Sequence, residues 1–470
     1  MIFDAFHLSA LDPAMIELWD SEIFEGTDHS IRWPRLTPEA VSHIAQRARN
    51  AGAALRAKPV AEIIRIIDAA VASMFDDAPT RGLLTELVTT NTGYSEPMTE
   101  LVLQRMQTDW REAALHALVR AELGDAAVLD GFHATDGRAK HAAGPGLALH
   151  IFAGNVPGVA VTSLIRGLLV KSPAIGKTAA GEKILAPVFA RAFAAIAPDL
   201  QDAVAITYWE GGTVELEAAA LEHADTVIHY GGRDSIEELR VRTPAGVRIV
   251  EHGPRLSFGM VGRESLAVGD VDRLVRDVAS AVATFDQQGC VSPHVVFVEE
   301  GGPTQPRDFA KKVADALAAL EVVLPPGRVD AADAGAIRRA RDRAEFRAIA
   351  GCDTTAWSGG MPGHTVIYEA EAALTASCLN RTITIHPVPS LNDVTPFLLP
   401  FRHLLQSVAV AANADRVTSL APVLAVAGVT RITTFAELPW PPPTWHHDGR
   451  GPLLELIRWT DVNHPSSFSA

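Results

Sequence analysis

One cysteine lies at a junction where a thiol can act as a nucleophile. Cys290 follows the segment 284–289, and it stands between a stretch with helical spacing (271–284) and an apolar run (295–298) typical of a buried strand. Loops at such junctions often carry function, and a helix end or polar neighbours can lower the pKa of a thiol. The alternative is a small buried core residue, so the interpretation depends on what other segments supply.

A side-chain amide far upstream supplies one such partner. Asn155 lies in the loop 153–158, which contains glycine and proline and directly follows an apolar run. An amide at this place can donate a hydrogen bond to a developing oxyanion, jointly with the backbone N–H of Cys290. The alternative is an Asx-type turn residue before proline.

The elements that must position Asn155 alternate between strands and helices. Four apolar runs typical of strands are separated by helical patterns, at 147–152, 174–176, 203–208 and 226–230. The alternation predicts an α/β fold with a parallel, helix-covered sheet, whose ligands bind at the carboxyl ends of the strands. Loops rich in glycine or small residues leave those ends, at 153–158, 177–182 and 231–234. They suit a dinucleotide, although no GxGxxG fingerprint follows the first strand.

The rest of the chain predicts further helices and strands. Residues 38–120 have helical spacing, with Thr37 as the N-cap and a break near Gly93. Apolar spacing also predicts a strand at 127–129, helices at 309–319, 332–349 and 402–412, a strand at 382–385, and a strand or short helix at 453–459.

Composition limits the class of protein. The chain has 470 residues, which favours two or more domains. Its net charge of −15 and the absence of a dense Lys/Arg run argue against nucleic acid as a ligand. No apolar window is long enough to predict a membrane span. Three dispersed cysteines, Cys290, Cys352 and Cys378, are too few for a disulfide framework or a zinc site, so we expect a cytoplasmic protein without a metal.

Six motifs in order resemble the acyl-CoA reductase family typified by the fatty-acid reductase of bacterial bioluminescence, within the aldehyde dehydrogenase superfamily. They cover roughly residues 30–465. The motifs are His150 to Gly158, Lys177, Tyr208 to Gly212, His229 to Gly232, Asp286 to Pro293, and His447-Asp448-Gly449. The resemblance implies an aldehyde dehydrogenase-like fold with two Rossmann-like domains and a bridging strand element. Residues 1–255 would mainly bind the dinucleotide, with bridging strands at about 125–149. Residues 256–436 would carry the nucleophile, and 437–470 would return to the first domain.

The resemblance also implies residue roles. Cys290 matches the nucleophile and Asn155 the side-chain oxyanion donor. Lys177 matches the lysine that binds the adenosine ribose, and Gly231-Gly232 the turn that approaches the diphosphate. These roles fit the chemistry of a lysine point charge and of glycine backbone; for Lys177 a solvated surface lysine is the alternative. The expected cofactor is NADPH, with NADH as the alternative.

The implied reaction is reduction of an acyl-CoA or other acyl thioester to the aldehyde through a cysteine thioester. One alternative is that a partner acyl-protein ligase delivers the acyl group. Another is a thiol acyltransferase or a noncatalytic scaffold without cofactor binding. Oxidation of aldehydes is a lesser rival, because Glu251 lies farther from Cys290 than the family's general base usually does. Bridging strands need a partner surface, so a homo-oligomer is expected.

Three histidines are candidates for roles near the thiol. His294 could tune the pKa of Cys290, or it could be a strand-entry residue with a satisfied hydrogen bond. His446 and His447 precede Asp448, but adjacent histidines do not share a helix face and no other cluster has ligand spacing. A structural role is therefore expected for them, with His447 as a proton donor to the aldehyde oxygen as the minor alternative.

Overall fold

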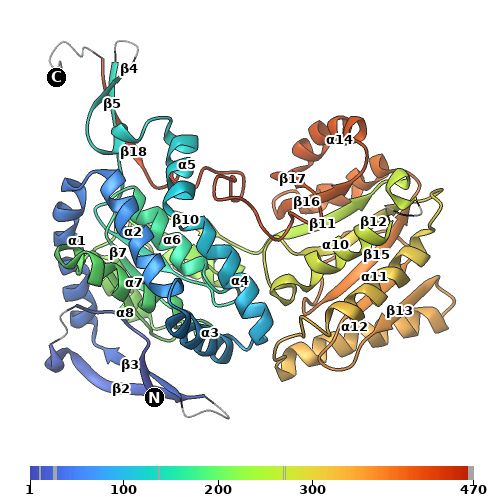
Figure 1. Cartoon of the computed structure of the whole chain (residues 1–470), viewed down its shortest axis with the longest axis horizontal. Coiled ribbons are helices and arrows are strands. Elements are labelled where there is room, and N and C mark those ends of the chain that lie inside the picture. The colour runs from blue at the N-terminus through green and yellow to red at the C-terminus, as the bar shows by residue number, and fades with distance from the viewer. Residues whose placement is uncertain (10–11, 25–28, 136–137, 268, 270, 464–470) are drawn as a thin grey trace. The chain divides into compact units, whose positions relative to one another are not determined.

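The structure of this protein is a computed structural model, and it describes residues 1–9, 12–24, 29–135, 138–267, 269 and 271–463. The chain forms two compact units (Figure 1). The first unit contains Met1–Thr92, Val102–Gly253 and Pro442–Ala470, and the second contains Gly93–Leu101 and Pro254–Pro441. The chain therefore enters the second unit after Gly253 and returns to the first at Pro442. Dinucleotide binding by one unit and catalysis by the other stay predictions.

A five-stranded sheet in the order β10-β9-β6-β7-β8 forms the centre of the first unit. Its neighbouring strands are all parallel, as the alternation of elements predicts. The strands are β6 (Ala148–Ile151), β7 (Ala174–Lys177), β8 (Val204–Thr207), β9 (Thr226–Tyr230) and β10 (Arg248–His252). The first four are buried along their whole length, because helices cover both faces of the sheet.

Helices pack on both faces of this sheet because alternate strand residues point to opposite sides. Leu149, Ile151 and Val227 share one apolar cluster with residues of α1 and α8. Ala148, Ile228 and Tyr230 belong to another, with residues of α2, α6 and α7. The helices of the unit are α1 (Pro38–Ala57), α2 (Val60–Phe75), α3 (Ala78–Thr92), α4 (Glu96–Asp109, which begins in the second unit), α5 (Glu112–Leu123), α6 (Val159–Leu169), α7 (Leu185–Ile196), α8 (Val214–Leu221) and α9 (Arg233–Arg242).

The predicted helical region is confirmed, including its N-cap and its break. Thr37 Oγ1 accepts a hydrogen bond from the Ala40 N–H at 3.1 Å, and α3 ends at Thr92, before Gly93 with φ +79°. The strand predicted at 127–129 is wrong. Ala126–Leu129 form a 3-10 turn, because the Asp125 carboxylate accepts the Ala127 N–H at 2.9 Å and caps it.

Two three-stranded sheets complete the first unit. One has the order β1-β3-β2, from Ile2–Asp4, Ser30–Leu36 and Ile16–Ile23. The other has the order β18-β5-β4, from Arg458–Val462, Arg138–Ala143 and His133–Thr135. β18 therefore brings the end of the chain back to β5, as Figure 1 shows. Strands therefore form in the predicted bridging segment at about 125–149 and in the returning segment 437–470; their role in oligomerisation stays a prediction.

The second unit is built on a seven-stranded sheet in the order β13-β14-β15-β12-β11-β16-β17, parallel except for β13. The strands are β11 (Leu256–Val261), β12 (Pro293–Glu299), β13 (Thr354–Ser358), β14 (Thr365–Glu369), β15 (Thr382–Val388), β16 (Leu405–Ala411) and β17 (Arg431–Thr433). The helices are α10 (Val271–Ala283), α11 (Pro306–Leu320), α12 (Ala331–Ile349), α13 (Thr395–Leu398) and α14 (Ala414–Ala427).

The helix predicted at 402–412 is wrong, because β16 occupies this segment. β16 lies between β11 and β17 and is buried on both faces. An apolar run buried on both sides lacks the alternation that distinguishes a strand from a helix. The other strands and helices predicted in this unit are confirmed. No helix among the described residues is long and apolar enough to cross a membrane.

Candidate active site

Cys290 is half-buried in a short turn between α10 and the buried strand β12. A 3-10 segment, η5 (Thr284–Gln287), joins α10 to this turn. The Cys290 carbonyl accepts a hydrogen bond from Ser257 Oγ at 2.9 Å, and the Ser292 N–H donates to the Gly289 carbonyl at 2.9 Å. The predicted junction of helix, loop and strand is therefore confirmed, with the backbone on both sides of the thiol held by hydrogen bonds.

The backbone just before Cys290 is strained. Phe285, Asp286 and Gln287 have φ values of 58°, 46° and 65°, in the left-handed region that side chains with a Cβ rarely occupy. Each such residue costs on the order of 1–3 kcal/mol, and such conformations persist only where surrounding contacts impose them. The contacts that impose this turn therefore determine where the thiol lies.

A buried ion pair is the first of these contacts. The Asp286 carboxylate accepts from Arg381 Nε at 2.8 Å and from the Gly327 N–H at 2.9 Å. Arg381 is 1% exposed, and its other nitrogens donate to the carbonyls of Leu324 and Pro325 at 2.8 and 3.1 Å. Burial raises the pKa of Asp286 and the Arg381 charge opposes this rise.

An amide side chain and a tyrosine hold the rest of the turn. Gln287 Nε2 donates to the carbonyls of Pro293 and Thr382 at 2.7 and 2.8 Å, and its Oε1 accepts the Thr382 N–H at 2.8 Å. The Tyr94 hydroxyl donates to the Phe285 carbonyl at 2.9 Å. Gln287 thus ties the strand that follows Cys290 to β15. Sequence reasoning missed Arg381 and Tyr94, since both lie far from Cys290 in the chain and no local pattern marks them.

Arg431 interacts electrostatically with Cys290, whereas His294 carries little charge near pH 7. Burial lowers the pKa of Arg431 to about 10, and the charges of Glu437 and Cys290 oppose this. A neighbouring cation favours a thiolate. Burial lowers the pKa of His294 to about 4, and its Nδ1 accepts the Ser377 N–H at 3.0 Å. His294 is therefore neutral near pH 7, which favours the strand-entry alternative for it.

In the first unit, Lys177 and His229 lie in one row across the carboxyl edge of the sheet. Ile151 pairs in register with both, so their side chains point to the same face, toward α8. Lys177 is 8% exposed; burial lowers its pKa and the charge of Glu217 on α8 raises it. Burial and, to a smaller extent, the charge of Lys177 lower the pKa of His229 to about 4. Lys177 is therefore a strand-end lysine with little exposure, and not a solvated one.

The two glycines of the predicted diphosphate turn differ. The Gly231 N–H donates to the His252 carbonyl at 3.2 Å, and a Cβ on Gly231 would lie 2.7 Å from His229 Nε2. Gly231 is thus required for packing. Gly232 precedes α9, and a Cβ built on it meets no atom within 4 Å. Space for a close ligand exists at Gly232.

Asn155 is exposed in the loop between β6 and α6. This loop packs on the loop that follows Lys177, because a Cβ on Gly154 would lie only 2.9 Å from the Gly181 Cα. After the predicted loop 177–182, α7 begins at Leu185, where the Glu182 carboxylate accepts the N–H groups of Ile184 and Leu185 at 2.8 Å each. The first unit therefore gathers Asn155, Lys177, Gly231 and Gly232 at one edge of its sheet, while Cys290 belongs to the second unit.

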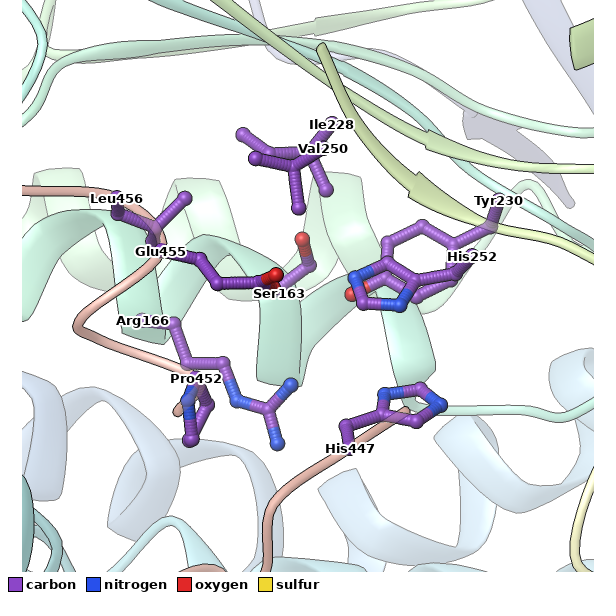
Figure 2. A pocket seen from close by; sticks show the side chains of 10 residues that line it. All are labelled: Ser163, Arg166, Ile228, Tyr230, Val250, His252, His447, Pro452, Glu455 and Leu456. Carbon is purple, nitrogen blue, oxygen red and sulfur yellow. The ribbon is translucent and has the colours of Figure 1, made fainter. Parts of the chain in front are cut away.

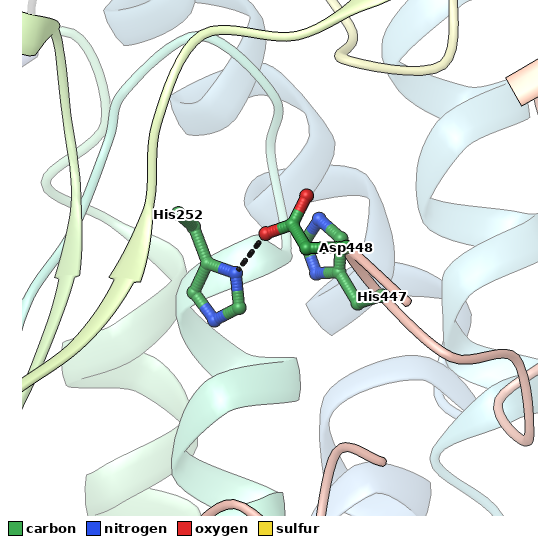
Figure 3. A group of neighbouring side chains, drawn as sticks. All are labelled: His252, His447 and Asp448. Atoms are coloured by element: carbon green, nitrogen blue, oxygen red, sulfur yellow. Dashed lines mark hydrogen bonds and ion pairs between the residues drawn. The ribbon is translucent and has the colours of Figure 1, made fainter. Parts of the chain in front are cut away.

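Sequence reasoning also missed a partner for His447 and Asp448. His252 Nδ1 is 2.9 Å from Asp448 Oδ2, and the His252 and His447 rings stack at 4.5 Å with an interplanar angle of 14° (Figure 3). One ligand atom from each of the three residues lies within 4.8 Å of the others. Imidazole binds a metal through a ring nitrogen, whose lone pair lies in the ring plane, and two parallel stacked rings do not direct such lone pairs to one point. The group is better described as a hydrogen-bonded aromatic stack.

Comparison with known proteins gives the family. The model of the family described as acyl-CoA reductase (LuxC) matches residues 55–459. The chain belongs to the acyl-CoA reductase (LuxC) family. It is 23% identical to a long-chain acyl-protein thioester reductase of Vibrio harveyi over 399 residues, which cover 83% of this chain and 78% of that protein. It is 25% identical to a protein of the same name from Photobacterium phosphoreum over 391 residues, 80% of this chain and 75% of that one.

Solved structures show the fold of this LuxC-family chain. Aldehyde dehydrogenase 21 from Physcomitrella patens superposes with a TM-score of 0.77 at 12% identity, covering 99% of both chains. The NADP-dependent glyceraldehyde-3-phosphate dehydrogenase from Bacillus halodurans superposes with a TM-score of 0.75 at 15% identity, covering 95% of this chain and 96% of that one. The predicted aldehyde dehydrogenase-like α/β fold and the family resemblance are both confirmed.

Proposed function

We propose that this protein reduces an acyl thioester to the aldehyde with NADPH, through an acyl-thioester on Cys290. The observation that carries the proposal is the position of Cys290. In a LuxC-family chain, a half-buried thiol follows a left-handed turn that is held by buried polar side chains and precedes a buried strand. Strain retained by such contacts is typical of functional sites.

The edge of the first unit fits a nicotinamide dinucleotide. Lys177 would bind the adenosine ribose, and Gly232 with the first turn of α9 would approach the diphosphate. The side chain of Glu182 is turned inward as a cap of α7 and is 3% exposed, so it is not available to a ribose hydroxyl. The Lys177 ammonium therefore has no free carboxylate from its own loop beside it. A lysine in this setting favours the 2′-phosphate of the adenosine ribose, which supports NADPH over NADH.

The chain's own residues account for the acyl chemistry. The Cys290 thiolate attacks the thioester carbonyl, and the Asn155 amide is the proposed donor to the resulting oxyanion. Collapse expels the leaving thiolate and leaves the acyl group on Cys290. A reduced nicotinamide supplies the hydride when bound. Breakage of the C–S bond of the resulting thiohemiacetal then releases the aldehyde and the free thiol.

Oxidation of aldehydes to acids is less well supported. A hydrolytic base must be free to take a proton from water. Glu251, the nearest match to such a base, forms an ion pair with Arg240 and lies on the same face of the sheet as His229. Its carboxylate is therefore committed to a surface contact.

The acyl donor is tested by measuring aldehyde formation. Acyl-CoA esters of increasing chain length are supplied with NADPH or NADH, with and without an acyl-protein ligase charged with the same acyl group. Turnover of free acyl-CoA without the partner would support an acyl-CoA reductase. Turnover that requires the charged protein would support the partner-delivered alternative. No NADPH binding and no aldehyde under any condition would overturn the proposal in favour of an acyltransferase or a scaffold.

Asn155→Ala is expected to lower the rate of acyl-enzyme formation by on the order of 10²–10³, as the loss of one oxyanion donor does. Single-turnover acylation of Cys290 by a labelled acyl thioester measures this. The thermal midpoint, measured alongside, shows whether the fold of the variant is intact. An unchanged acylation rate would leave Asn155 as a turn residue.

Lys177→Ala is expected to weaken NADPH binding more than NADH binding. Loss of a charge-assisted hydrogen bond is worth about 1.5–3 kcal/mol, roughly tenfold or more in Kd. Fluorescence titration with both cofactors gives the two Kd values. Lys183→Ala is a matched control in the same loop, because Lys183 Nζ is paired with Glu22 at 2.8 Å. Equal losses for both cofactors would contradict selection of the 2′-phosphate by Lys177.

A further inference from the structure

Arg431 lies on β17, an edge strand of the seven-stranded sheet in the second unit. Its guanidinium donates to two backbone carbonyls that follow in the chain, those of Leu438 at 2.9 Å and Glu437 at 2.6 Å. A guanidinium has five N–H donors and keeps its positive charge near neutral pH. The two carbonyls therefore hold the guanidinium in place without neutralising it.

The backbone of Cys290 is joined to β17 through two neighbouring strands. Its carbonyl accepts a hydrogen bond from Ser257 Oγ on β11 at 2.9 Å, and the same hydroxyl accepts the Ser407 N–H on β16 at 3.2 Å. Ser407 is the register partner of Arg431. Adjacent strands lie about 4.8 Å apart, so the Arg431 side chain starts roughly 10 Å across the sheet from the residue that holds the Cys290 carbonyl.

The segment that holds the Arg431 guanidinium also packs on the turn before the thiol. Trp440 meets the ring of Phe285 edge-on, with 5.2 Å between the ring centroids. The Phe285 ring in turn covers Gly289, where a Cβ would lie 3.0 Å from Phe285 Cδ2. Segment 437–440 thus fixes the guanidinium and contacts the strained turn at the same time.

The Arg431 charge and the thiol act on each other. Burial lowers the pKa of Arg431 to about 10, and the charges of Glu437 and Cys290 oppose this. An interaction between two charged groups is mutual, so a cation that a negative Cys290 favours in turn favours the thiolate. Arg431 remains positively charged at the pH values at which an ordinary thiol, with a pKa of about 8.5, titrates.

The other ionisable groups beside the turn add little net charge. Asp286 is paired with Arg381 at 2.7 Å, and His294 is neutral near pH 7 because burial lowers its pKa to about 4. Burial raises the pKa of Tyr94 well above its ordinary value, so its hydroxyl is neutral too. Strands β11 and β16 contribute no charged side chain. The described contacts thus point to Arg431 as the cation that acts on the thiol.

Two other arginines act on groups of a different kind. In the first unit, Arg166 shares a small hollow with Glu455, and its charge acts on that carboxylate (Figure 2). In the second unit, Arg255 precedes β11 and donates to the His403 carbonyl at 3.0 Å. Arg431 differs from both because a thiol is one of the two charges that act on it.

We propose that Arg431 is a positioning residue that keeps Cys290 in the thiolate form, and that segment 437–440 holds it there. The inference rests on the proposed function, in which Cys290 is the nucleophile. The cation acts twice in that reaction. It stabilises the thiolate before the attack on the thioester, and it stabilises the same thiolate again when the C–S bond of the thiohemiacetal breaks and its electron pair returns to sulfur.

The test measures how the alkylation of Cys290 by iodoacetamide depends on pH, in the full chain with both other cysteines replaced by serine. Arg431→Gln keeps N–H donors for the two carbonyls but removes the charge, whereas Arg431→Lys keeps the charge. Arg431→Gln should lower the alkylation rate at pH 7 about tenfold and move the midpoint of the rate profile to higher pH, and Arg431→Lys should stay within about threefold of the parent. Arg307→Met, which removes an arginine of the same unit from an exposed pair with Asp353, should leave the profile unchanged.

Glu437→Gln is a second variant that leaves Arg431 and its two carbonyl anchors in place. It removes an exposed carboxylate whose charge acts on Arg431, so the midpoint should move to lower pH. A midpoint that Arg431→Gln leaves unchanged, equal shifts in Arg431→Gln and Arg431→Lys, or a rise in Glu437→Gln would overturn the proposal. The measurement needs neither an acyl thioester nor a nicotinamide. A protein that forms no aldehyde but shows these shifts would therefore contradict the proposed function and not this inference.

Discussion

Cys290→Ser is expected to abolish acyl-enzyme formation and to lower aldehyde formation by at least on the order of 10³. A serine hydroxyl has a far higher pKa than a cysteine thiol and is therefore a much weaker nucleophile near pH 7. The side chain is half-buried and changes little in volume, so the fold should survive. Incubation with a radiolabelled acyl thioester, followed by denaturing electrophoresis, measures the covalent adduct.

The other two thiols provide matched controls. Cys352 is exposed and Cys378 is half-buried, and both are free. Cys352→Ser and Cys378→Ser should each retain the adduct and the rate of aldehyde formation. A labelled adduct that survives in Cys290→Ser but disappears in Cys378→Ser would show that the nucleophile has been assigned to the wrong residue.

Arg381→Met is expected to destabilise the second unit by about 3–5 kcal/mol, because it leaves the buried Asp286 carboxylate without its counter-ion. The left-handed turn at 285–287 depends on that carboxylate, so the reactivity of Cys290 should fall as well. Urea unfolding measures the first effect. The rate of alkylation of Cys290 by iodoacetamide, at urea concentrations where the fold is intact, measures the second.

Two controls test whether the effect of Arg381→Met comes from the unpaired, buried Asp286 carboxylate. One variant removes an arginine from a surface ion pair, and the other removes both members of the buried pair. Arg347 pairs with Glu369 and with Glu371, which is 79% exposed, so Arg347→Met should lower the free energy of unfolding far less than Arg381→Met does. Asp286→Leu combined with Arg381→Met should be less destabilised than Arg381→Met alone, because it leaves no unpaired charge. Recovery of stability without recovery of the alkylation rate would show that the ion pair positions the thiol. A stability loss near that of Arg347→Met would refute the importance of the pair.

The pH dependence of the Arg381→Met variant has a definite sign. Burial raises the pKa of Asp286, and in the variant the Arg381 charge no longer opposes this. A carboxyl whose pKa is higher in the folded than in the unfolded state loses stability as pH rises above the unfolded value of about 4. The deficit relative to the wild type should therefore shrink toward pH 4 and grow toward neutral pH. A deficit independent of pH would exclude an ionised Asp286 as its cause.

Secondary structure was predictable from the sequence wherever a segment has a clear hydrophobic pattern of its own. The parallel sheet of the first unit was predicted from apolar runs at 147–152, 174–176, 203–208 and 226–230, because each strand is short, apolar and bounded by glycine or polar residues. The two errors share a cause. Residues 127–129 and 408–411 are short apolar runs without periodicity. Only the cap at Asp125 distinguishes a turn from a strand in the first, and only burial between β11 and β17 distinguishes a strand from a helix in the second.

The sequence by itself determined the family, the α/β fold and the junction that carries Cys290, because ordered motifs and hydrophobic periodicity are properties of contiguous residues. The tertiary structure alone decided what holds that junction. Arg381 and Tyr94 reach the turn from distant segments, and His294 is neutral because of burial. It also decided that Arg166 on α6 lies buried. Long-range pairing and desolvation depend on which segments the fold brings together, and no local pattern records them.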